Sequence, residues 1–327
     1  MSIEGKHRTM TTLHIVGSGA IGSLLAAGAH KHKIHYALYP RTPVTTPVTP
    51  PDKSVSNTPG YVQWTDGTQY PLTQVKTNKQ PLFENDILLL PLKVYQLESA
   101  LTEWRSLLSR KTPVILLHNG LGGYEIAQKI LPDSQPLVLA TTSHGAMKQH
   151  DNSHQCHVVY TGVGATQLGL APHLIPKYGS HNPVWFNTLQ QTLNSVLPPV
   201  QSQQNILSAL WAKLAINSVI NPLTALNDIP NARICDDEFA TKRKQLCEEF
   251  VLVARACGFC FEADDIEQRV IKVATLTGKN YSSMHQDVMH NRTTEIDAIN
   301  GYLVQLANKK GIEVPLNTFL VEQIKAL

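Results

Sequence analysis

The sequence has few of the features that mark specialised classes of protein. Its formal net charge is only +3 in 327 residues, and the basic residues are dispersed, which argues against a nucleic acid partner. Five cysteines, an odd number in a chain of this length, do not suggest a disulfide framework. Cys257 and Cys260 have the spacing of a redox motif, but they follow a helix-like run without a second pair. We interpret them as ordinary packing residues.

Long apolar runs are also missing from the sequence. No run approaches the roughly 20 residues that a membrane span needs, and the first ten residues lack the hydrophobic core of a secretory signal. We therefore expect a cytoplasmic protein that does not bind a membrane. With 42% hydrophobic and 16% charged residues, the composition is that of a soluble globular protein. The length is sufficient for two domains, each with its own core.

A glycine-rich turn lies in the setting that a dinucleotide site requires. A short predicted strand over residues 13–16 runs into the turn, and a predicted helix follows over residues 23–30. The turn reads Gly17-Ser18-Gly19-Ala20-Ile21-Gly22. Gly17 allows the tight turn, Gly19 lets a pyrophosphate approach the backbone, and Gly22 lets the helix pack closely on the strand. Free amide groups at the start of the helix would bind the phosphate, although a glycine-rich turn of another α/β protein remains the alternative.

The second predicted strand, residues 35–39, indicates which cofactor the turn binds. It ends without the Asp or Glu that would bind a ribose 2′-hydroxyl, and Arg41 follows it. A cation at this point suits a 2′-phosphate, so the sequence favours NADP over NAD. The alternative for Arg41 is a solvated loop residue beside Pro40. The residues that follow, 42–59, are rich in Thr and Pro, and we interpret them as a surface loop.

Three further apolar runs predict buried parallel strands, and polar residues follow each of them. The runs are residues 87–92, 114–117 and 137–140, and the polar residues after them include Lys93, His118, Asn119, Ser143 and His144. Ligands of doubly wound sheets bind beyond the carboxyl ends of the strands, which is where these residues fall. Turn chemistry explains Asn119-Gly120 equally well, and a structural role explains His118 and His144 at least as well as a functional one.

The pattern changes at about residue 203, where strand-like runs end and helical periodicity takes over. We therefore predict an α/β fold with an N-terminal Rossmann-type doubly wound sheet over residues 1–202, followed by a mainly helical C-terminal domain over residues 203–327.

Three polar residues recur at four-residue intervals in an otherwise apolar helical run. Lys213, Asn217 and Asn221 thus share one helical face. An ammonium and two carboxamides among Leu, Ile and Val carry a desolvation penalty unless each has a partner, and a bound polar substrate would supply all three. Pro222 stops or kinks the helix, so Asn221 is also explained as a residue at a helix end.

Two more helix starts are predicted further along the chain. Ser282-Ser283-Met284 begins a helix with a serine at its capping position. Thr294 begins another, and Glu295 lies beside the apolar stripe of that helix. Without a substrate, Glu295 is explained as a first-turn acid that the helix dipole favours.

Together these motifs resemble those of the ketopantoate reductases, the NADP-dependent 2-dehydropantoate 2-reductases of pantothenate biosynthesis. The resemblance covers the chain from residue 10, which leaves residues 1–9 as an extension that we expect to be disordered. It rests on the glycine-rich turn, Leu92-Lys93, His118-Asn119-Gly120, residues 210–224, Ser282-Ser283-Met284 with Asp287, and residues 294–301.

The resemblance implies hydride transfer from NADPH to the ketone of 2-dehydropantoate, with Lys213 as the general acid. It implies that Glu295 either contacts the substrate hydroxyl or orients the lysine, and that Glu295 also contacts the cofactor. The remaining implied roles are substrate binding by Asn217, Asn221, Ser283 and Asn119, and cofactor binding by the turn Gly17 to Gly22, Arg41, Lys93 and Asn119. It implies no metal, and we expect a monomer or a homodimer.

Two other functions remain open. A related two-domain NAD(P)-dependent dehydrogenase that acts on another 2-oxo acid, an imine or a polyol phosphate would share the fold. A non-catalytic nucleotide-sensing protein would keep the glycine-rich turn and lose the acid and the substrate-binding residues, and here both sets are present.

Overall fold

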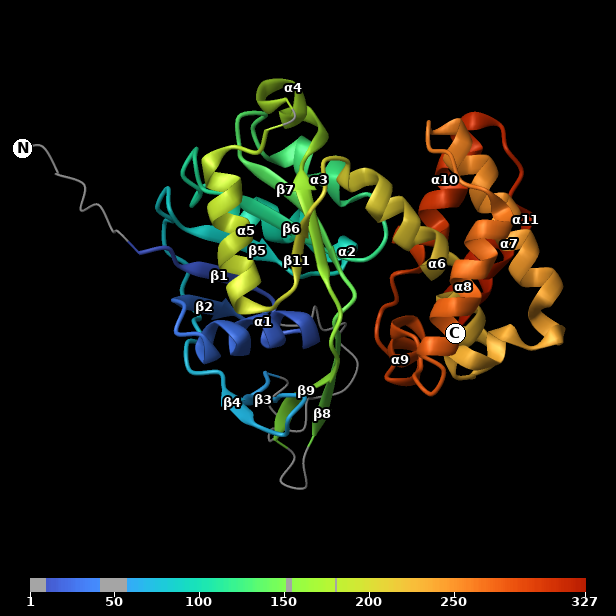
Figure 1. Cartoon of the computed structure of the whole chain (residues 1–327), viewed down its shortest axis with the longest axis horizontal. Coiled ribbons are helices and arrows are strands. Elements are labelled where there is room, and N and C mark those ends of the chain that lie inside the picture. Colours follow the sequence, from blue (N-terminus) through green and yellow to red (C-terminus); the bar gives the residue numbers. More distant parts are fainter. Residues whose placement is uncertain (1–9, 42–57, 151–154, 180) are drawn as a thin grey trace, which may run out of the picture. The chain divides into compact units, whose positions relative to one another are not determined.

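The computed structural model describes residues 10–41, 58–150, 155–179 and 181–327 (Figure 1). The chain divides into two compact units: residues 1–118 with 123–206, and residues 119–122 with 207–327. The extension expected at residues 1–9 and nearly all of the surface loop expected at residues 42–59 lie outside the described residues. The functional division expected at residues 202 and 203 stays a prediction.

The first unit is built on a seven-stranded sheet in the order β11-β10-β7-β6-β5-β1-β2. The strands are β1 (Leu13–Val16), β2 (Tyr36–Tyr39), β5 (Ile87–Leu90), β6 (Val114–Leu117), β7 (Leu137–Thr142), β10 (Thr166–Leu170) and β11 (Val200–Ser202). β2, β1, β5, β6 and β7 pair in parallel, whereas β10 is antiparallel to β7. The strand order reverses at β1, because β2 lies on one side of it and β5 on the other. The expected Rossmann-type α/β fold is confirmed, and such a reversal is where open α/β sheets bind ligands.

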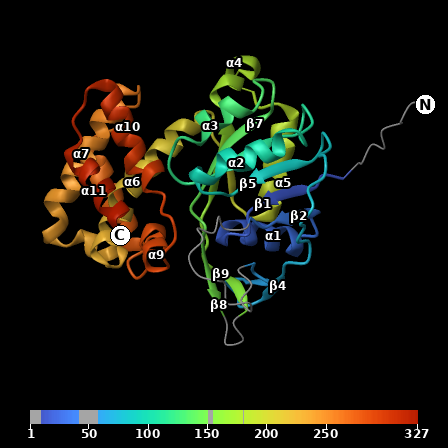
Figure 2. The ribbon, with the colours of Figure 1, turned by 180° about the vertical axis from the view of Figure 1, so that it is seen from behind.

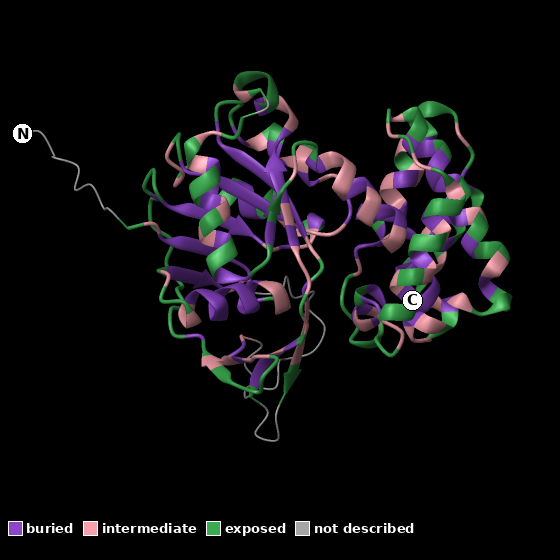
Figure 3. Ribbon diagram, in the orientation of Figure 1, coloured by how far each residue is buried: buried purple, intermediate pink, exposed green. Residues whose placement is uncertain are grey.

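Helices cover both faces of this sheet. α1 (Ala20–Lys31) and α5 (Val184–Val196) lie on one face, and α2 (Val94–Arg105) and α3 (Gly123–Ile130) lie on the other (Figures 1 and 2). α1 and α5 approach closely because Gly28 has no side chain; a Cβ there would overlap the Val196 carbonyl oxygen. Since both faces are covered, the central strands are buried along their length, which explains their continuous apolar sequences (Figure 3).

A smaller sheet in the order β4-β3-β9-β8 completes the first unit. Its strands are β3 (Tyr61–Gln63), β4 (Gln69–Pro71), β8 (Gly145–His150) and β9 (Cys156–Gly162), and the short helical segments η1 (Pro172–Leu174) and α4 (Ile175–Tyr178) follow β10. His144 lies directly before β8, with its Nδ1 2.7 Å from the Tyr160 hydroxyl and 3.0 Å from the Gly164 amide nitrogen. Burial lowers the pKa of His144. These contacts support a structural role for His144.

The second unit is helical. It contains α6 (Ile206–Asn227), α7 (Ala240–Ala256), α8 (Ala263–Leu276), α9 (Ser283–Met289), α10 (Asn300–Lys310) and α11 (Pro315–Ala326), with short turns η2 (Asn231–Cys235), η3 (Asp237–Phe239) and η4 (Ile296–Ala298). Among the described helices, α6 is long and apolar enough to cross a membrane, but most of it is buried within the structure. Trp211 of α6 stacks on Phe259 with ring centres 4.9 Å apart. α6 continues through Pro222, so the alternative in which the helix ends at Asn221 is wrong.

Asp86, directly before β5, is a buried carboxylate that fixes the amino-terminal ends of β1 and β5. It accepts hydrogen bonds from the Thr12 amide at 3.2 Å and the Phe83 amide at 2.9 Å, and its Oδ2 lies 3.5 Å from His14 Nε2. Burial acts to raise the pKa of Asp86, but its contacts with His14, Phe83 and Thr12 outweigh burial and hold that pKa below 3.8. The carboxylate is therefore ionised at neutral pH and satisfies two backbone amides.

We expect Asp86→Ala to lower the free energy of unfolding by about 2–3 kcal/mol, because two amide groups lose a charged acceptor. Urea unfolding followed by circular dichroism measures the change, and Glu98→Ala, on the exposed side of α2, is the control. The difference should shrink as the pH falls through the lowered pKa of Asp86, since protonation removes the stabilisation that is present above 3.8. Equal urea midpoints for the two variants would contradict this role.

Candidate active site

The candidate residues fall into two groups, one in each unit, and each group has its own geometry. The first unit holds Gly17, Ser18, Gly19, Ala20, Ile21, Gly22, Arg41 and Lys93, and the second holds Asn119, Lys213, Asn217, Asn221, Ser283 and Glu295.

The glycine-rich turn joins β1 to α1 and has the shape that a pyrophosphate site needs. Gly17 has φ +109°, which side-chain-bearing residues rarely adopt, and a Cβ on Gly22 would overlap the Gly17 carbonyl oxygen. A Cβ on Gly19 would meet no atom within 4 Å. Gly19 caps α1 without a side-chain hydrogen bond, and the first turn of α1 has no acidic residue. The turn therefore fits an anion at the start of the helix.

Arg41 follows β2 and is held by the side chains of α2. Its Nη2 donates to Ser99 Oγ at 2.9 Å and lies 3.5 Å from Glu103 Oε1. Lys79 Nζ lies 2.7 Å from Glu103 Oε2, so the two cations and one carboxylate leave one net positive charge. Arg41 Nη1 is buried and has no hydrogen-bond partner within the described ranges. The guanidinium is thus held in place with one nitrogen that could bind an anion.

Lys93 lies between the end of β5 and the start of α2. Pro91 follows the last residue of β5, which agrees with the irregular strand end that a proline predicts. Lys93 N donates to Gln96 Oε1 at 3.3 Å, and Gln96 N donates to Lys93 O at 2.8 Å. This reciprocal cap fixes the start of α2 and places Lys93 beyond the carboxyl end of a central strand.

The second group centres on the polar face of α6. Lys213, Asn217 and Asn221 follow one another at four-residue intervals along the helix, and Asn221 is buried. Lys213 keeps some accessible surface, yet burial lowers its pKa to about 8, while the Glu295 carboxylate acts to raise it. Its ammonium is therefore charged at neutral pH but is a stronger acid than an exposed lysine, as proton donors in active sites often are.

Glu295 is buried, and the segment 119–122 approaches it. Its Oε2 accepts a hydrogen bond from Asn119 Nδ2 at 3.2 Å. The Leu121 amide donates to the Ala298 carbonyl at 2.9 Å, and a Cβ on Gly120, which has φ +73°, would overlap that carbonyl oxygen. The backbone therefore packs closely against η4 and brings Asn119 to the carboxylate.

The helix expected to begin at Thr294 is not continuous. Glu295 caps the short turn η4, and the regular helix α10 begins only at Asn300. The single-helix prediction was wrong because Ile299 leaves helical geometry, with ψ −91°, between the two elements.

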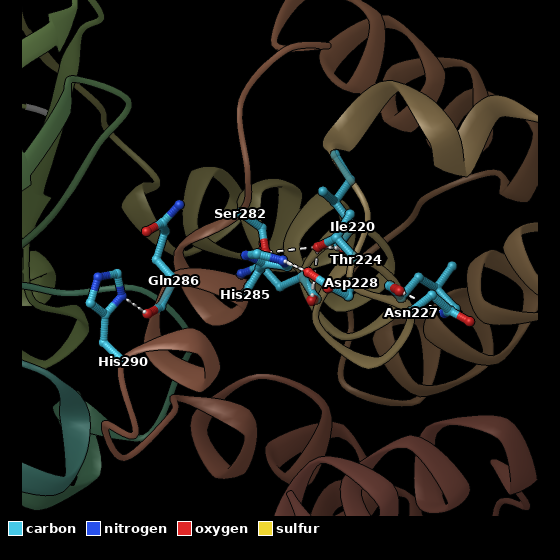
Figure 4. A network of polar contacts seen from close by, with 10 residues as sticks. Ile220, Thr224, Asn227, Asp228, Ser282, His285, Gln286 and His290 are labelled. Carbon is cyan, nitrogen blue, oxygen red and sulfur yellow. Dashed lines mark hydrogen bonds and ion pairs between the residues drawn. The ribbon is translucent and has the colours of Figure 1, made fainter.

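Ser283 is the first residue of α9, and a neighbouring polar network attaches α9 to the end of α6 (Figure 4). Ser282 Oγ accepts a hydrogen bond from His285 N at 3.1 Å, which confirms the expected serine cap. Ser282 Oγ also lies 2.7 Å from Thr224 Oγ1, and His285 Nε2 lies 2.7 Å from Asp228 Oδ1. Ser283 itself is exposed, so its hydroxyl is accessible to a ligand.

Sequence reasoning missed the residues that hold these groups in place. They are Ser99 and Glu103 beside Arg41, Asp228 and His285 beside Ser283, and Asn300 beside α6. Pro222 was the one available signal, because a proline within a helix predicts an earlier carbonyl that needs another donor. Within the described ranges, no group of three or more His, Cys, Asp or Glu residues could hold a metal ion.

Comparisons with known proteins match both units. The family model described as "Ketopantoate reductase PanE/ApbA" matches residues 13–173, and its C-terminal counterpart matches residues 205–327. A 2-dehydropantoate 2-reductase of Vibrio cholerae is 34% identical over 313 residues, which are 96% of each chain. One of Shigella flexneri is 36% identical over 261 residues, 80% of each chain.

Solved structures share the fold at lower identity. A ketopantoate reductase of the PanE/ApbA family from Ralstonia eutropha has a TM-score of 0.76 at 22% identity, covering 97% of this chain and 98% of its own. D-Mandelate dehydrogenase with NADH and anilino(oxo)acetate has a TM-score of 0.78 at 21% identity, with the same coverage. The family models and the curated relatives together show that the chain belongs to the ketopantoate reductase family.

Proposed function

We propose that this chain reduces 2-dehydropantoate to pantoate with NADPH, a step of pantothenate biosynthesis in the cytoplasm. The observation that carries the proposal is the position and pKa of Lys213. Its ammonium shares a helical face with Asn217 and Asn221. Burial lowers the pKa of Lys213, and the Glu295 carboxylate acts to raise it. Curated relatives named 2-dehydropantoate 2-reductase, 30–36% identical to this chain, support the substrate.

Lys213 is the proton donor of the proposed reaction. Bound NADPH would supply the hydride that adds to the ketone carbon. The Lys213 ammonium stabilises the negative charge that develops on the ketone oxygen and then gives that oxygen its proton. The neutral amine regains a proton from solvent. Glu295 keeps Lys213 charged before the reaction by opposing the effect of burial on its pKa.

The other polar residues of the second unit hold the substrate. Ser283 offers an exposed hydroxyl for the substrate carboxylate, and Asn217 and Asn221 offer carboxamides that donate and accept hydrogen bonds at the hydroxyl and carboxylate ends. Asn119 orients Glu295 through the hydrogen bond between them and takes part in ligand binding.

The first unit binds the cofactor in this proposal. The glycine-rich turn holds the pyrophosphate, Lys93 contacts the cofactor, and Arg41 binds the 2′-phosphate that distinguishes NADP from NAD. Arg41 Nη1, which has no hydrogen-bond partner among the residues that the structure describes, supports this role, although Glu103 neutralises part of the charge of Arg41. The protein acts as a monomer or a homodimer; a ketopantoate reductase from Staphylococcus aureus with the same fold is dimeric.

The proposed function predicts a decline of NADPH absorbance when 2-dehydropantoate is added to the purified protein. A panel of 2-oxo acids, each tested with NADPH and with NADH, measures the preference. The panel includes 2-oxo acids without the terminal hydroxyl and the 2-oxo acid that corresponds to mandelate. Preference for one of these, or absence of turnover with every member, would overturn the proposed substrate.

Lys213→Ala should abolish most turnover while NADPH binding stays close to that of the wild type, because the proton donor is lost and the cofactor site is unchanged. We expect kcat to fall by about 10² to 10⁴, the usual contribution of a positioned acid. Lys272→Ala, an exposed lysine of α8, should keep wild-type kcat as the control. A Lys213→Ala variant with nearly wild-type kcat would remove Lys213 from the role of acid.

The pH dependence of kcat tests whether Lys213 must be protonated for the reaction. Since Lys213 donates a proton only while it is charged, kcat for reduction should fall as the pH rises through about 8. The guanidinium of Lys213→Arg stays charged throughout this pH range, so any residual kcat should not show this decline.

Arg41→Ala should raise the KM for NADPH much more than the KM for NADH, because only NADPH carries the 2′-phosphate. Steady-state kinetics with each cofactor gives the two ratios. Arg105→Ala, an exposed arginine of α2, is the matched control and should change neither. Equal increases for NADPH and NADH would place Arg41 outside the 2′-phosphate site.

A further inference from the structure

Pro222 interrupts the hydrogen bonding of α6 between Asn217 and the end of the helix. Proline has no N–H, so the carbonyl of Ser218, four residues earlier, loses the donor that an α-helix normally supplies. Ser218 is 1% exposed, so solvent cannot easily replace that donor. A buried carbonyl without a donor carries a desolvation cost, and another group must therefore meet it.

Asn300 supplies the missing donor. Its Nδ2 donates to the Ser218 carbonyl at 2.8 Å, across 82 residues of sequence, and its side chain is fully buried. Asn300 is the first residue of α10 and lies five residues after Glu295. The bond therefore joins the turn of α6 before Pro222, in the helix that carries Lys213, to the segment that carries Glu295.

Asn300 is itself held by a chain of buried hydrogen bonds. Its Nδ2 also donates to Asn317 Oδ1 at 2.9 Å, which uses both hydrogens of the amide group. The Asn317 side chain donates through Nδ2 to Glu249 Oε2 at 2.8 Å, and the backbone N–H of Asn317 donates to the same oxygen at 2.9 Å. Glu249 is buried on α7 and accepts from the Leu316 amide as well, at 2.9 Å. The carboxylate thus fixes Asn317, and Asn317 fixes Asn300.

We propose that Asn300 is a positioning residue for the reaction: its bond to the Ser218 carbonyl, which Pro222 leaves without a helical donor, holds the Lys213-bearing part of α6 in register with Glu295. This inference rests on the proposed function. Asn300 touches neither Lys213 nor a reacting atom in this account and acts through the backbone of α6.

Loss of the bond has a specific electrostatic consequence. The Glu295 carboxylate acts to raise the pKa of Lys213, against the effect of burial. If the Lys213-bearing part of α6 moves away from η4, this opposing effect weakens and the pKa of Lys213 falls further. A purely structural role for Asn300 would lower the stability of the unit without this change.

The first experiment is an NMR titration of the protein with ¹³C-labelled lysine, with Lys213→Arg used to assign the signal. We expect the wild-type pKa near the value of about 8 and a decrease of about 0.5 in Asn300→Leu. Asn308→Leu is the same substitution at an exposed position of α10 and should leave the pKa unchanged. The same pKa in Asn300→Leu and Asn308→Leu would overturn the proposal. If Asn300→Leu does not fold, Asn300→Ser, whose hydroxyl is too short to reach the carbonyl, takes its place.

The second experiment is a rescue by Pro222→Ala. Alanine restores an N–H that can donate to the Ser218 carbonyl, so the effect of Asn300→Leu should be smaller in the Pro222→Ala background. An undiminished effect in the double variant would show that the Ser218 carbonyl is not the point of action, and would overturn the proposal.

Kinetics with NADPH and 2-dehydropantoate completes the test. We expect Asn300→Leu to lower kcat about tenfold with little change in the KM for NADPH, and the loss to shrink in the double variant. A kcat equal to that of Asn308→Leu would contradict the positioning role. Absence of turnover in the wild type, with the pKa coupling intact, would overturn the proposed function and leave the coupling between Asn300 and Lys213 standing.

Discussion

The free-energy cost of burying the Lys213 ammonium is the constraint on which the helical unit depends. Burial lowers the pKa of Lys213 to about 8, and the Glu295 carboxylate opposes this effect. Glu295 must then be held as firmly as the lysine. Its hydrogen bond from Asn119, the packing of residues 119–122 on η4 and the link from Asn300 to α6 all serve this end. These contacts join segments that lie far apart in the sequence.

In the proposed function, the first unit meets a simpler requirement, which is the approach of its backbone to a phosphate of the cofactor. Because β1 lies where the strand order reverses, the turn after it opens at the edge of the sheet where ligands of such folds bind. Gly17 and Gly22 shape that turn, and Gly19 leaves space in front of α1. These requirements involve only neighbouring residues, so residues 13–22 alone contain the whole pattern.

This difference explains how much the sequence could predict. The strand, glycine-rich turn and helix at the start of the first unit are contiguous, and Lys213, Asn217 and Asn221 recur at four-residue intervals. The sequence predicted the secondary structure of both stretches correctly. The break between η4 and α10, and the partners Asp228 and His285, depend on contacts between distant segments. A proline inside a helix leaves an earlier carbonyl without its usual donor, but no local pattern could name Asn300, 82 residues away from Ser218, as the replacement.

The central claim is that Lys213 gives its proton to the substrate oxygen. A crystal structure of the protein with NADP and pantoate tests it most directly, because the product hydroxyl marks the position of the reacting oxygen. The account predicts Lys213 Nζ about 3 Å from that hydroxyl, with Asn217 and Ser283 on the rest of the ligand. A hydroxyl that contacts another proton donor, with Lys213 beyond hydrogen-bond distance, would contradict it.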